Sequence, residues 1–206
     1  MSATRVKDSS VMTKRISEHP IEPIFLDRWS PRAYDAGEMP AVDLLTILEA
    51  ARWAPSAYNI QPWRFLYSLR GDKHWQDYLD LLDTFNQSWA HHASALVFIL
   101  SDSIDPNNDN VPKKTSRCHS FDAGAAWAQL ALQATALGYQ AHGMAGIDYD
   151  QSRLQLCVPE HCRVEIAVAI GTRDEPSILP RNLQDREYPS QRLPLNEIAF
   201  AGLFPQ

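Results

Sequence analysis

The sequence predicts a single domain of the α+β class. Helical and strand-like patterns alternate along the chain, and the strands do not follow one another directly, which favours α+β over a doubly wound sheet. The chain has 206 residues, 45% of them hydrophobic, which is enough for one core. We expect a flexible leader over residues 1–20 and one folded domain over residues 21–206.

The first elements follow from local patterns. Apolar residues at helical spacing after Pro40 predict a helix that ends near Ala54, because Pro55 disfavours helical geometry in the residue before it. Alternating side chains predict a strand over residues 63–69, closed by Gly71. One apolar stripe predicts a single helix over residues 75–89, and residues 95–101 are expected to form a buried strand.

The second half holds a helix, two strands and a long tail. Asp122 is expected to cap an alanine-rich, tightly packed helix that runs to Leu137 and stops at Gly138. Strands are expected over residues 140–147 and 164–170, and an exposed loop over residues 105–115. The last thirty residues contain many prolines yet keep large apolar side chains, which predicts an extended arm laid across another surface.

Composition excludes several classes of protein. The net charge is −6, from 19 basic and 25 acidic residues, and no long basic run occurs, so neither nucleic acid nor an anionic membrane is an expected partner. No apolar run approaches the roughly 20 residues that span a bilayer, and residues 1–20 lack the apolar core of a signal peptide. Three cysteines are too few for a disulfide framework, which favours a cytoplasmic location.

Common catalytic and metal-binding motifs are absent. The eight glycines form neither GxGxxG nor a Walker loop, and neither HExxH nor GxSxG occurs. Cys157, His161 and Cys162 in the segment CVPEHC could suggest a metal site, but a second ligand pair is lacking. A turn before a strand is the favoured interpretation, and no metal is predicted.

Three groups of residues could bind a ligand. Arg28 and Arg32, around Ser30, could clamp a phosphate or an electron-rich carbonyl, although two surface arginines beside a proline are commonplace. The loop over residues 55–63 could aim short polar groups at a ligand, or Ser and Asn could satisfy their own backbone. Asn86 lies on an apolar helix stripe, where its amide needs either a backbone partner or a planar polar ligand.

Taken in order, these segments resemble the nitroreductase family of FMN-dependent oxidoreductases. The resemblance covers the chain from Pro20 onward and rests on six segments that are similar to family motifs: Arg28-Trp29-Ser30-Pro31-Arg32 (R-x-S-x-R), residues 55–63 (PSxxNxQPW), Phe85-Asn86, Asp122-x-Gly124, residues 143–148 (GxxGFD) and Arg192-Leu193-Pro194 (K-x-R-L-P).

The resemblance implies a mainly antiparallel sheet flanked by helices, in an intertwined homodimer with an extended C-terminal arm and two FMN sites at the subunit interface. Phosphate and ribityl would be held by Arg28, Ser30 and Arg192, and Arg32 would approach the pyrimidine edge. The full set of implied cofactor-binding residues is Arg28, Trp29, Ser30, Arg32, Pro55, Ser56, Ala57, Asn59, Gln61, Asn86, Met144, Ala145, Gly146 and Arg192.

Within that set, Asn86 would pair with the flavin, the backbone amides of Ala145 and Gly146 would face flavin N5 and O4, and Ser56 and Asn59 would come from the other subunit. Two positions depart from the family pattern. Ser190 and Trp89 stand where family members often carry lysine, so fewer cations face the flavin.

The function implied is hydride transfer from NAD(P)H through flavin N5 to a small acceptor such as a nitroaromatic or a quinone, by a ping-pong mechanism. No protein acid or base is required, and Arg32 is the expected electrostatic contributor. The alternatives are another redox task on the same fold (dehalogenation, enal or flavin reduction) or a flavin-binding module with little turnover. A hydrolase that uses Ser56 or Cys118 lacks a base at a recognisable spacing.

Overall fold

The computed structural model describes residues 15–105 and 115–205. At its centre lies one antiparallel sheet in the order β1-β2-β4-β3, formed by β1 (Trp63–Leu69), β2 (Ala95–Asp102), β4 (Cys162–Gly171) and β3 (Gln140–Met144). The predicted α+β class with an antiparallel sheet is therefore confirmed. The predicted leader falls on residues 1–14, which lie outside the described residues, and on residues 15–20.

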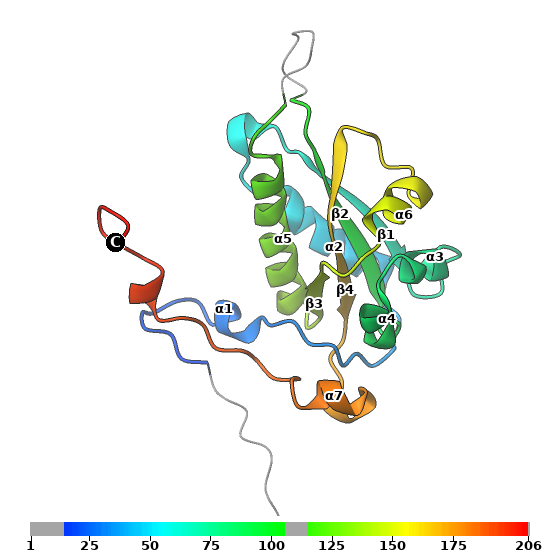
Figure 1. Cartoon of the computed structure of the whole chain (residues 1–206). Coiled ribbons are helices and arrows are strands. Elements are labelled where there is room, and N and C mark those ends of the chain that lie inside the picture. The colour runs from blue at the N-terminus through cyan, green and yellow to red at the C-terminus, as the bar shows by residue number, and fades with distance from the viewer. Residues whose placement is uncertain (1–14, 106–114, 206) are drawn as a thin grey trace, which may run out of the picture.

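Helices cover both faces of the sheet (Figure 1). The long α5 (His119–Ala136) and α2 (Ala41–Arg52) lie on one face, and α3 (Trp75–Asp80), α4 (Thr84–Ala90) and α6 (Tyr149–Gln155) on the other. Strand β2 shows why, because alternate side chains of a strand point to opposite faces. Val97 and Ile99 join the core under α2 and α5, whereas Leu96 and Phe98 join the second core.

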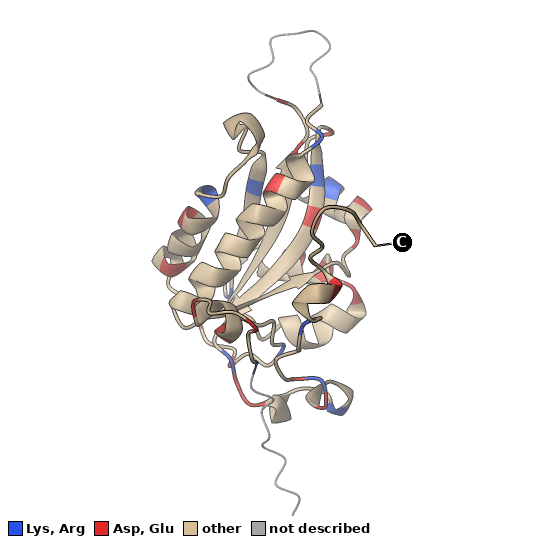
Figure 2. Ribbon diagram, turned by 90° about the vertical axis from the view of Figure 1, so that its left-hand side faces the viewer, with Lys and Arg blue, Asp and Glu red and all other residues tan. Residues whose placement is uncertain are grey.

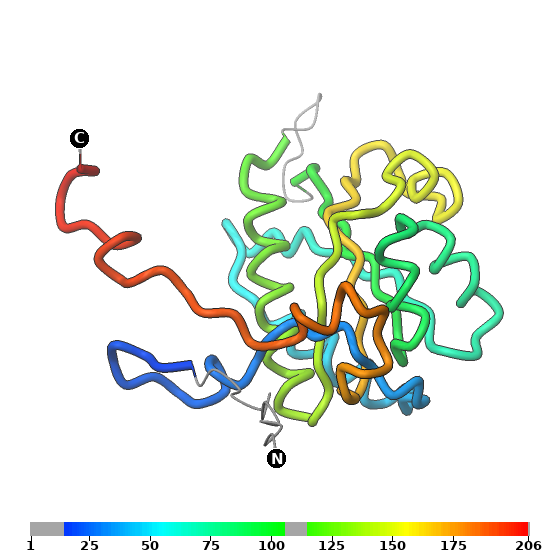
Figure 3. Tube along the Cα trace, turned by 60° about the horizontal axis from the view of Figure 1, so that its bottom comes forward, coloured from blue at the N-terminus to red at the C-terminus, as the bar shows by residue number. Residues whose placement is uncertain are grey.

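Short helices complete the chain. They are α1 (Ile24–Asp27), α7 (Arg181–Gln184) and three 3-10 turns, at Ala57–Asn59, Pro176–Ile178 and Leu195–Glu197. Figure 3 shows the segment that begins at residue 15 and the C-terminal segment running out from the body together. Leu193, Ile198, Leu203 and Phe204 are all exposed there. No helix in the described ranges is long and apolar enough to cross a membrane.

The expected helix over residues 75–89 is wrong, because the chain breaks between α3 and α4. Leu82 forms a β-bridge with Ile147, and the Asp83 N–H donates to the Gly146 carbonyl. The Asp83 carboxylate then caps α4 by accepting from the Asn86 N–H. Contacts with a segment sixty residues away thus interrupt a helix that the local pattern would continue.

The predicted cap of the central helix is also wrong. Helix α5 begins at His119 after Cys118, and Asp122 is buried inside it. Its carboxylate accepts from the Ala57 N–H at 3.1 Å instead. The predicted end is confirmed, because Gly138 follows the helix with φ of +87°, a conformation that glycine adopts without strain.

Candidate functional site

Arginines from three distant parts of the chain line one crevice. It has a volume of about 250 Å³ and is lined by Arg15, Arg28, Trp29, Ser30, Arg32, His142, Arg186, Tyr188, Ser190 and Arg192. Five of these residues carry guanidinium groups and none is acidic. The structure thus brings together the predicted Arg28, Trp29, Ser30, Arg32 and Arg192.

Two of these arginines were not predicted from the sequence. Arg15 donates to the carbonyl oxygens of Ser190 and Arg28, at 3.0 and 2.6 Å, and so joins the two segments that carry the predicted arginines. Arg186 follows α7 and lines the same crevice. The cation expected to be missing at Ser190 is therefore offset by cations from elsewhere in the chain.

The charges in the crevice repel one another. Burial lowers the pKa of Arg28, and the neighbouring Arg192 lowers it further. Burial also lowers the pKa of Arg15, with added repulsion from Arg192 and Arg28. Such a concentration of positive charge favours an anion with several oxygen acceptors, and a phosphate is a ligand of that kind.

Glu187 holds the backbone at the edge of the crevice. It is buried, and its Oε1 accepts from the backbone N–H groups of Arg32 and Ala33, at 2.6 and 2.9 Å. Its Oε2 lies 3.8 Å from Nη1 of Arg32. Arg32 Nε is buried without a hydrogen-bond partner among the described residues. This guanidinium is therefore fixed in place with donor capacity to spare.

His142, on β3, also lines the crevice. Its Nδ1 lies 2.9 Å from the Pro31 carbonyl oxygen, so this nitrogen carries the proton and donates it. Trp89 packs on the same ring at 4.7 Å between centroids, and Arg32 lies 6.0 Å from the Trp89 ring centre. Trp89 is fully buried, so it is part of the core and is closed to a ligand.

Asn86 and Gly146 meet beside α4. The Asn86 amide donates to the Gly146 carbonyl at 3.0 Å, so the backbone supplies the partner that this buried side chain needs. A Cβ atom at Gly146 would lie 2.1 Å from an Asp83 oxygen and 2.6 Å from the Asn86 amide nitrogen, which only glycine avoids. Of the neighbouring predicted residues, Met144 is buried in the core and Ala145 is exposed.

The predicted loop over residues 55–63 lies far from the crevice. It enters β1 at Trp63, which pairs with Ser101, and Ser101 pairs with Arg163 of β4. The crevice residue His142 pairs with Ala169, six residues further along β4, and six strand residues span about 20 Å. Figure 1 shows this loop beside the start of α5, at the opposite end from α1.

Within this loop, hydrogen bonds fix the backbone. The Gln61 N–H donates to Ser56 Oγ at 3.0 Å, and the Gln61 side chain donates to the Asn59 carbonyl. Tyr58 and Asn59 have positive φ values, and Tyr58 is 94% exposed. Pro55, Ser56, Ala57, Asn59 and Gln61 thus form a rigid surface loop, which one chain does not bring to the arginines.

The hydrolase alternative named Ser56, whose Oγ accepts from the Gln61 N–H, and Cys118. A serine, a histidine and a glutamate meet elsewhere in the chain. His119 Nδ1 lies 2.7 Å from Ser101 Oγ, which donates to Glu165 at 2.5 Å. Ser101 is completely buried, so no substrate reaches it. This group ties the start of α5 to the sheet.

Comparisons with known proteins agree on one family. Residues 26–82 and 68–172 match the sequence model of the nitroreductase family. The NADH dehydrogenase of Thermus thermophilus is 30% identical over 198 residues, which cover 84% of this chain and 91% of that protein.

Solved structures give the same result. A crystal structure described as an oxidoreductase containing FMN is 52% identical, with a TM-score of 0.90 over 93% of this chain and 96% of that one. A nitroreductase family protein from Streptococcus pneumoniae shares the fold, with 20% identity and a TM-score of 0.70 over 87% of this chain and 98% of that one.

Proposed function

Because the chain belongs to the nitroreductase family, we propose that it is an FMN-dependent oxidoreductase that uses NAD(P)H to reduce a small acceptor such as a nitroaromatic or a quinone. When bound, FMN would supply the redox chemistry, a hydride transfer through N5 from the nicotinamide to the acceptor in a ping-pong cycle. The observation that carries the proposal is the crevice with five arginines and no acidic lining residue.

The residues present fit a flavin phosphate. Arg28, Arg15 and Arg192 repel one another, and a phosphate dianion removes that repulsion while it accepts several hydrogen bonds. We assign the phosphate and the ribityl chain to Arg28, Ser30 and Arg192. Two similar crystal structures, one of them of a 52% identical chain, are described as containing FMN or as a complex with FMN, which supports this choice of cofactor.

Arg32 is the proposed electrostatic residue. Its guanidinium is held by Glu187 and keeps a buried Nε–H without a partner in the described structure. A fixed cation of this kind stabilises negative charge that develops on a ligand without any rearrangement of the site. We assign Arg32 to the pyrimidine edge, Asn86 to the same ring, and the Ala145 and Gly146 amides to the N5 side.

A second copy of the chain would complete each site. Helix α5 carries no Lys or Arg, and its one acidic residue, Asp122, is buried, so on the side of the molecule shown in Figure 2 this helix presents a surface nearly free of charge. The exposed apolar residues of the C-terminal segment need a surface to cover. We propose a homodimer in which Ser56 and Asn59 of the partner subunit approach the flavin. All three cysteines are free thiols, as in a protein of the cytoplasm.

Reconstitution tests the cofactor. The purified protein is titrated with FMN, and flavin fluorescence gives the dissociation constant. The loss of one charge-assisted hydrogen bond costs about 1.5–3 kcal/mol, so Arg28→Ala should weaken FMN binding roughly 10- to 150-fold. Arg52→Ala removes the same charge from an exposed pair with Glu49 and should leave the affinity unchanged. Equal effects of the two variants would contradict the assignment.

Anaerobic reduction then tests the activity. NADH or NADPH should bleach the flavin absorbance, and a nitroaromatic or a quinone should restore it. Arg32→Ala should lower the rate or the reduction potential. A protein that binds FMN but is not bleached by either nicotinamide would be a flavin-binding module rather than an enzyme.

A further inference from the structure

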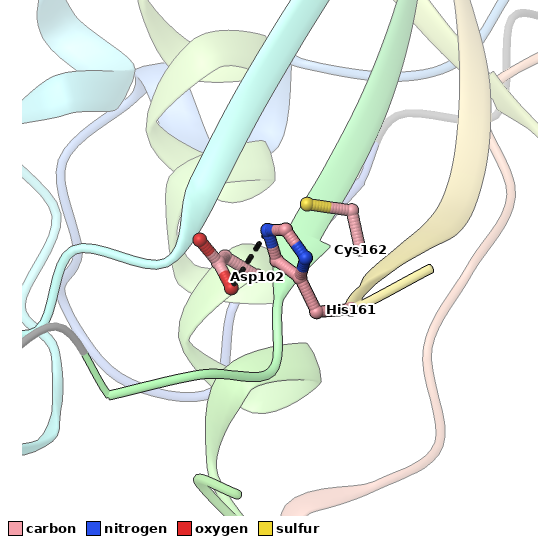
Figure 4. A group of neighbouring side chains, drawn as sticks. All are labelled: Asp102, His161 and Cys162. Carbon is pink, nitrogen blue, oxygen red and sulfur yellow. Dashed lines mark ion pairs between the residues drawn. The ribbon is translucent and has the colours of Figure 1, made fainter. Parts of the chain in front are cut away.

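A group of metal-ligating side chains lies at the other end of the sheet from the arginine crevice (Figure 4). It consists of Asp102, the last residue of β2, Cys162, the first residue of β4, and the adjacent His161. Asp102 and Cys162 are direct partners in the antiparallel ladder, so their side chains share one face. His161 belongs to the turn before β4 and points its ring toward both, as Figure 4 shows.

The separations suit one ion. The carboxylate oxygen, the imidazole nitrogen and the sulfur all lie within 4.8 Å of one another, and His161 Nε2 is 4.0 Å from Asp102 Oδ1. Around tetrahedral zinc, with bonds of about 2.0–2.3 Å, ligand atoms stand roughly 3.3–3.8 Å apart. Side-chain rotations that move the ligand atoms by about 1 Å are therefore enough to bring all three within bonding distance of one ion. The half-exposed His161 ring has room to rotate in this way.

The surroundings leave acceptor capacity on these atoms. Asp102 Oδ1 accepts one hydrogen bond, from the Ile104 N–H at 3.0 Å, and keeps a further lone pair for an ion. The Cys162 thiol makes no hydrogen bond within residues 15–105 and 115–205. The nearby arginines have partners of their own: Arg64 lies 3.3 Å from Asp102 Oδ2, Arg153 donates to the Cys162 carbonyl, and Arg163 pairs with Glu165. Because Arg64 sits on Oδ2, the other carboxylate oxygen is the one that faces His161.

A cavity of about 410 Å³ adjoins the group. Glu160, His161 and Cys162 line it, together with Ser103, Tyr149 and Arg153. An ion held by three side chains at the wall of a cavity keeps a fourth position for water or for the Glu160 carboxylate.

We propose that Asp102, His161 and Cys162 bind one Zn²⁺ ion, with the fourth position open to the adjoining cavity. Sulfur, imidazole nitrogen and carboxylate oxygen together form a zinc-type donor set, whereas magnesium and calcium prefer oxygen alone. The ion would join the ends of β2 and β4 to the turn at residues 157–161. The site shares no residue with the arginine crevice, so it stands or falls independently of the flavin.

Metal titration tests the site directly. The FMN-loaded protein, freed of any affinity tag, is titrated with Zn²⁺ against a coloured chelator and then with Co²⁺ in place of Zn²⁺. We expect one equivalent of each ion to bind, and the cobalt form to show the near-ultraviolet absorption band of a thiolate–cobalt bond. Absence of stoichiometric binding, or a cobalt spectrum without that band, would overturn the proposal.

Variants identify the ligands. His161→Gln changes an exposed side chain and should leave folding intact while weakening Zn²⁺ binding by about a hundredfold or more, since even residues behind the ligands are worth 10- to 100-fold. Cys162→Ser should abolish the cobalt–thiolate band. Cys157→Ser, which alters the exposed cysteine of the same segment, should change neither. Loss of the band in Cys157→Ser with its retention in Cys162→Ser would refute this ligand set.

Discussion

The two regions with predicted cofactor residues are built by different means. The arginine crevice is held by a buried charge, since Glu187 accepts from two backbone N–H groups and faces Arg32. The loop over residues 55–63 carries no charge until Arg64 and is held by its own backbone, with φ values of 51°, 56° and 53° at Tyr58, Asn59 and Gln61.

The difference shows how each region keeps its shape. Charges that are neutralised inside one chain can be buried there, as Glu187 is. The loop over residues 55–63, which we propose meets a second chain, contains no charged residue of its own. Residues with positive φ and one hydrogen bond, from the Ala57 N–H to the Asp122 carboxylate, fix the backbone of this loop. The Tyr58 side chain stays exposed. The loop is thus ready for contact without being buried.

Glu187→Ala gives the largest expected effect. It leaves two backbone N–H groups without their acceptor and the Arg32 guanidinium without the carboxylate that lies 3.8 Å away, and breaking a buried pair of this kind costs about 3–5 kcal/mol of unfolding free energy. Urea denaturation measures the loss. Glu49→Ala breaks an exposed, solvent-screened pair with Arg52 and should cost far less. Similar losses in both variants would show that charge does not hold the crevice.

An intermediate effect is expected from pH, through His142. Burial lowers the pKa of His142 to about 4, aided by Arg32 and Arg28 and opposed by the hydrogen bond to Pro31. The unfolded imidazole takes up a proton near pH 6.5 while the folded one stays neutral. The stabilisation is therefore complete above pH 6.5 and falls by roughly 3 kcal/mol as the pH drops to 4.

Comparing the free energy of unfolding against pH for two variants and the wild type isolates the contribution of His142. His142→Gln should flatten the difference between pH 7 and pH 4, and His74→Gln, which alters an exposed histidine, should follow the wild-type curve. If the His142→Gln and wild-type curves stay parallel, the ring is not held neutral by the crevice.

Tyr58→Gly gives the smallest expected change in folding stability. Glycine relieves a left-handed backbone worth about 1 kcal/mol but gains a similar entropy in the unfolded chain, so the net change should stay within about 0.5 kcal/mol. Sedimentation then tests the contact with a second copy, which should weaken. Tyr58→Ala keeps the strain and removes the ring, so it separates the two causes. Unchanged dimer affinity in both variants would show that Tyr58 does not contact a second copy of the chain.

Patterns confined to one segment were predicted well from the sequence. Strand β1 matches the predicted residues 63–69, since Pro62 and Gly71 bound the alternating run. The start of α2 after Pro40 and the end of α5 at Gly138 also follow from local chemistry. The errors come from distant contacts: the Asp83–Gly146 hydrogen bond divides one helix, and Ala57 takes the carboxylate of Asp122.

The site shows the same division. Arg28, Ser30 and Arg32 stand together in the sequence, so the spacing indicates a clamp. Arg15, Arg186 and Glu187 join it only after folding, from segments with no local signal of their own. Asp102 was likewise not predicted as a metal ligand. It meets Cys162 only because β2 pairs with β4, and the two residues are sixty positions apart in the sequence.

Arg15 ties together both ends of the described chain and one wall of the crevice. Its guanidinium reaches Leu26, Arg28 and Ser190, and further along the Leu195 N–H donates to Glu18. A shortened protein that started at residue 21 would lose the hydrogen bonds that Arg15 and Glu18 make with the C-terminal segment. That segment would then be released from the N-terminal one. The practical boundary of the domain therefore falls before Arg15.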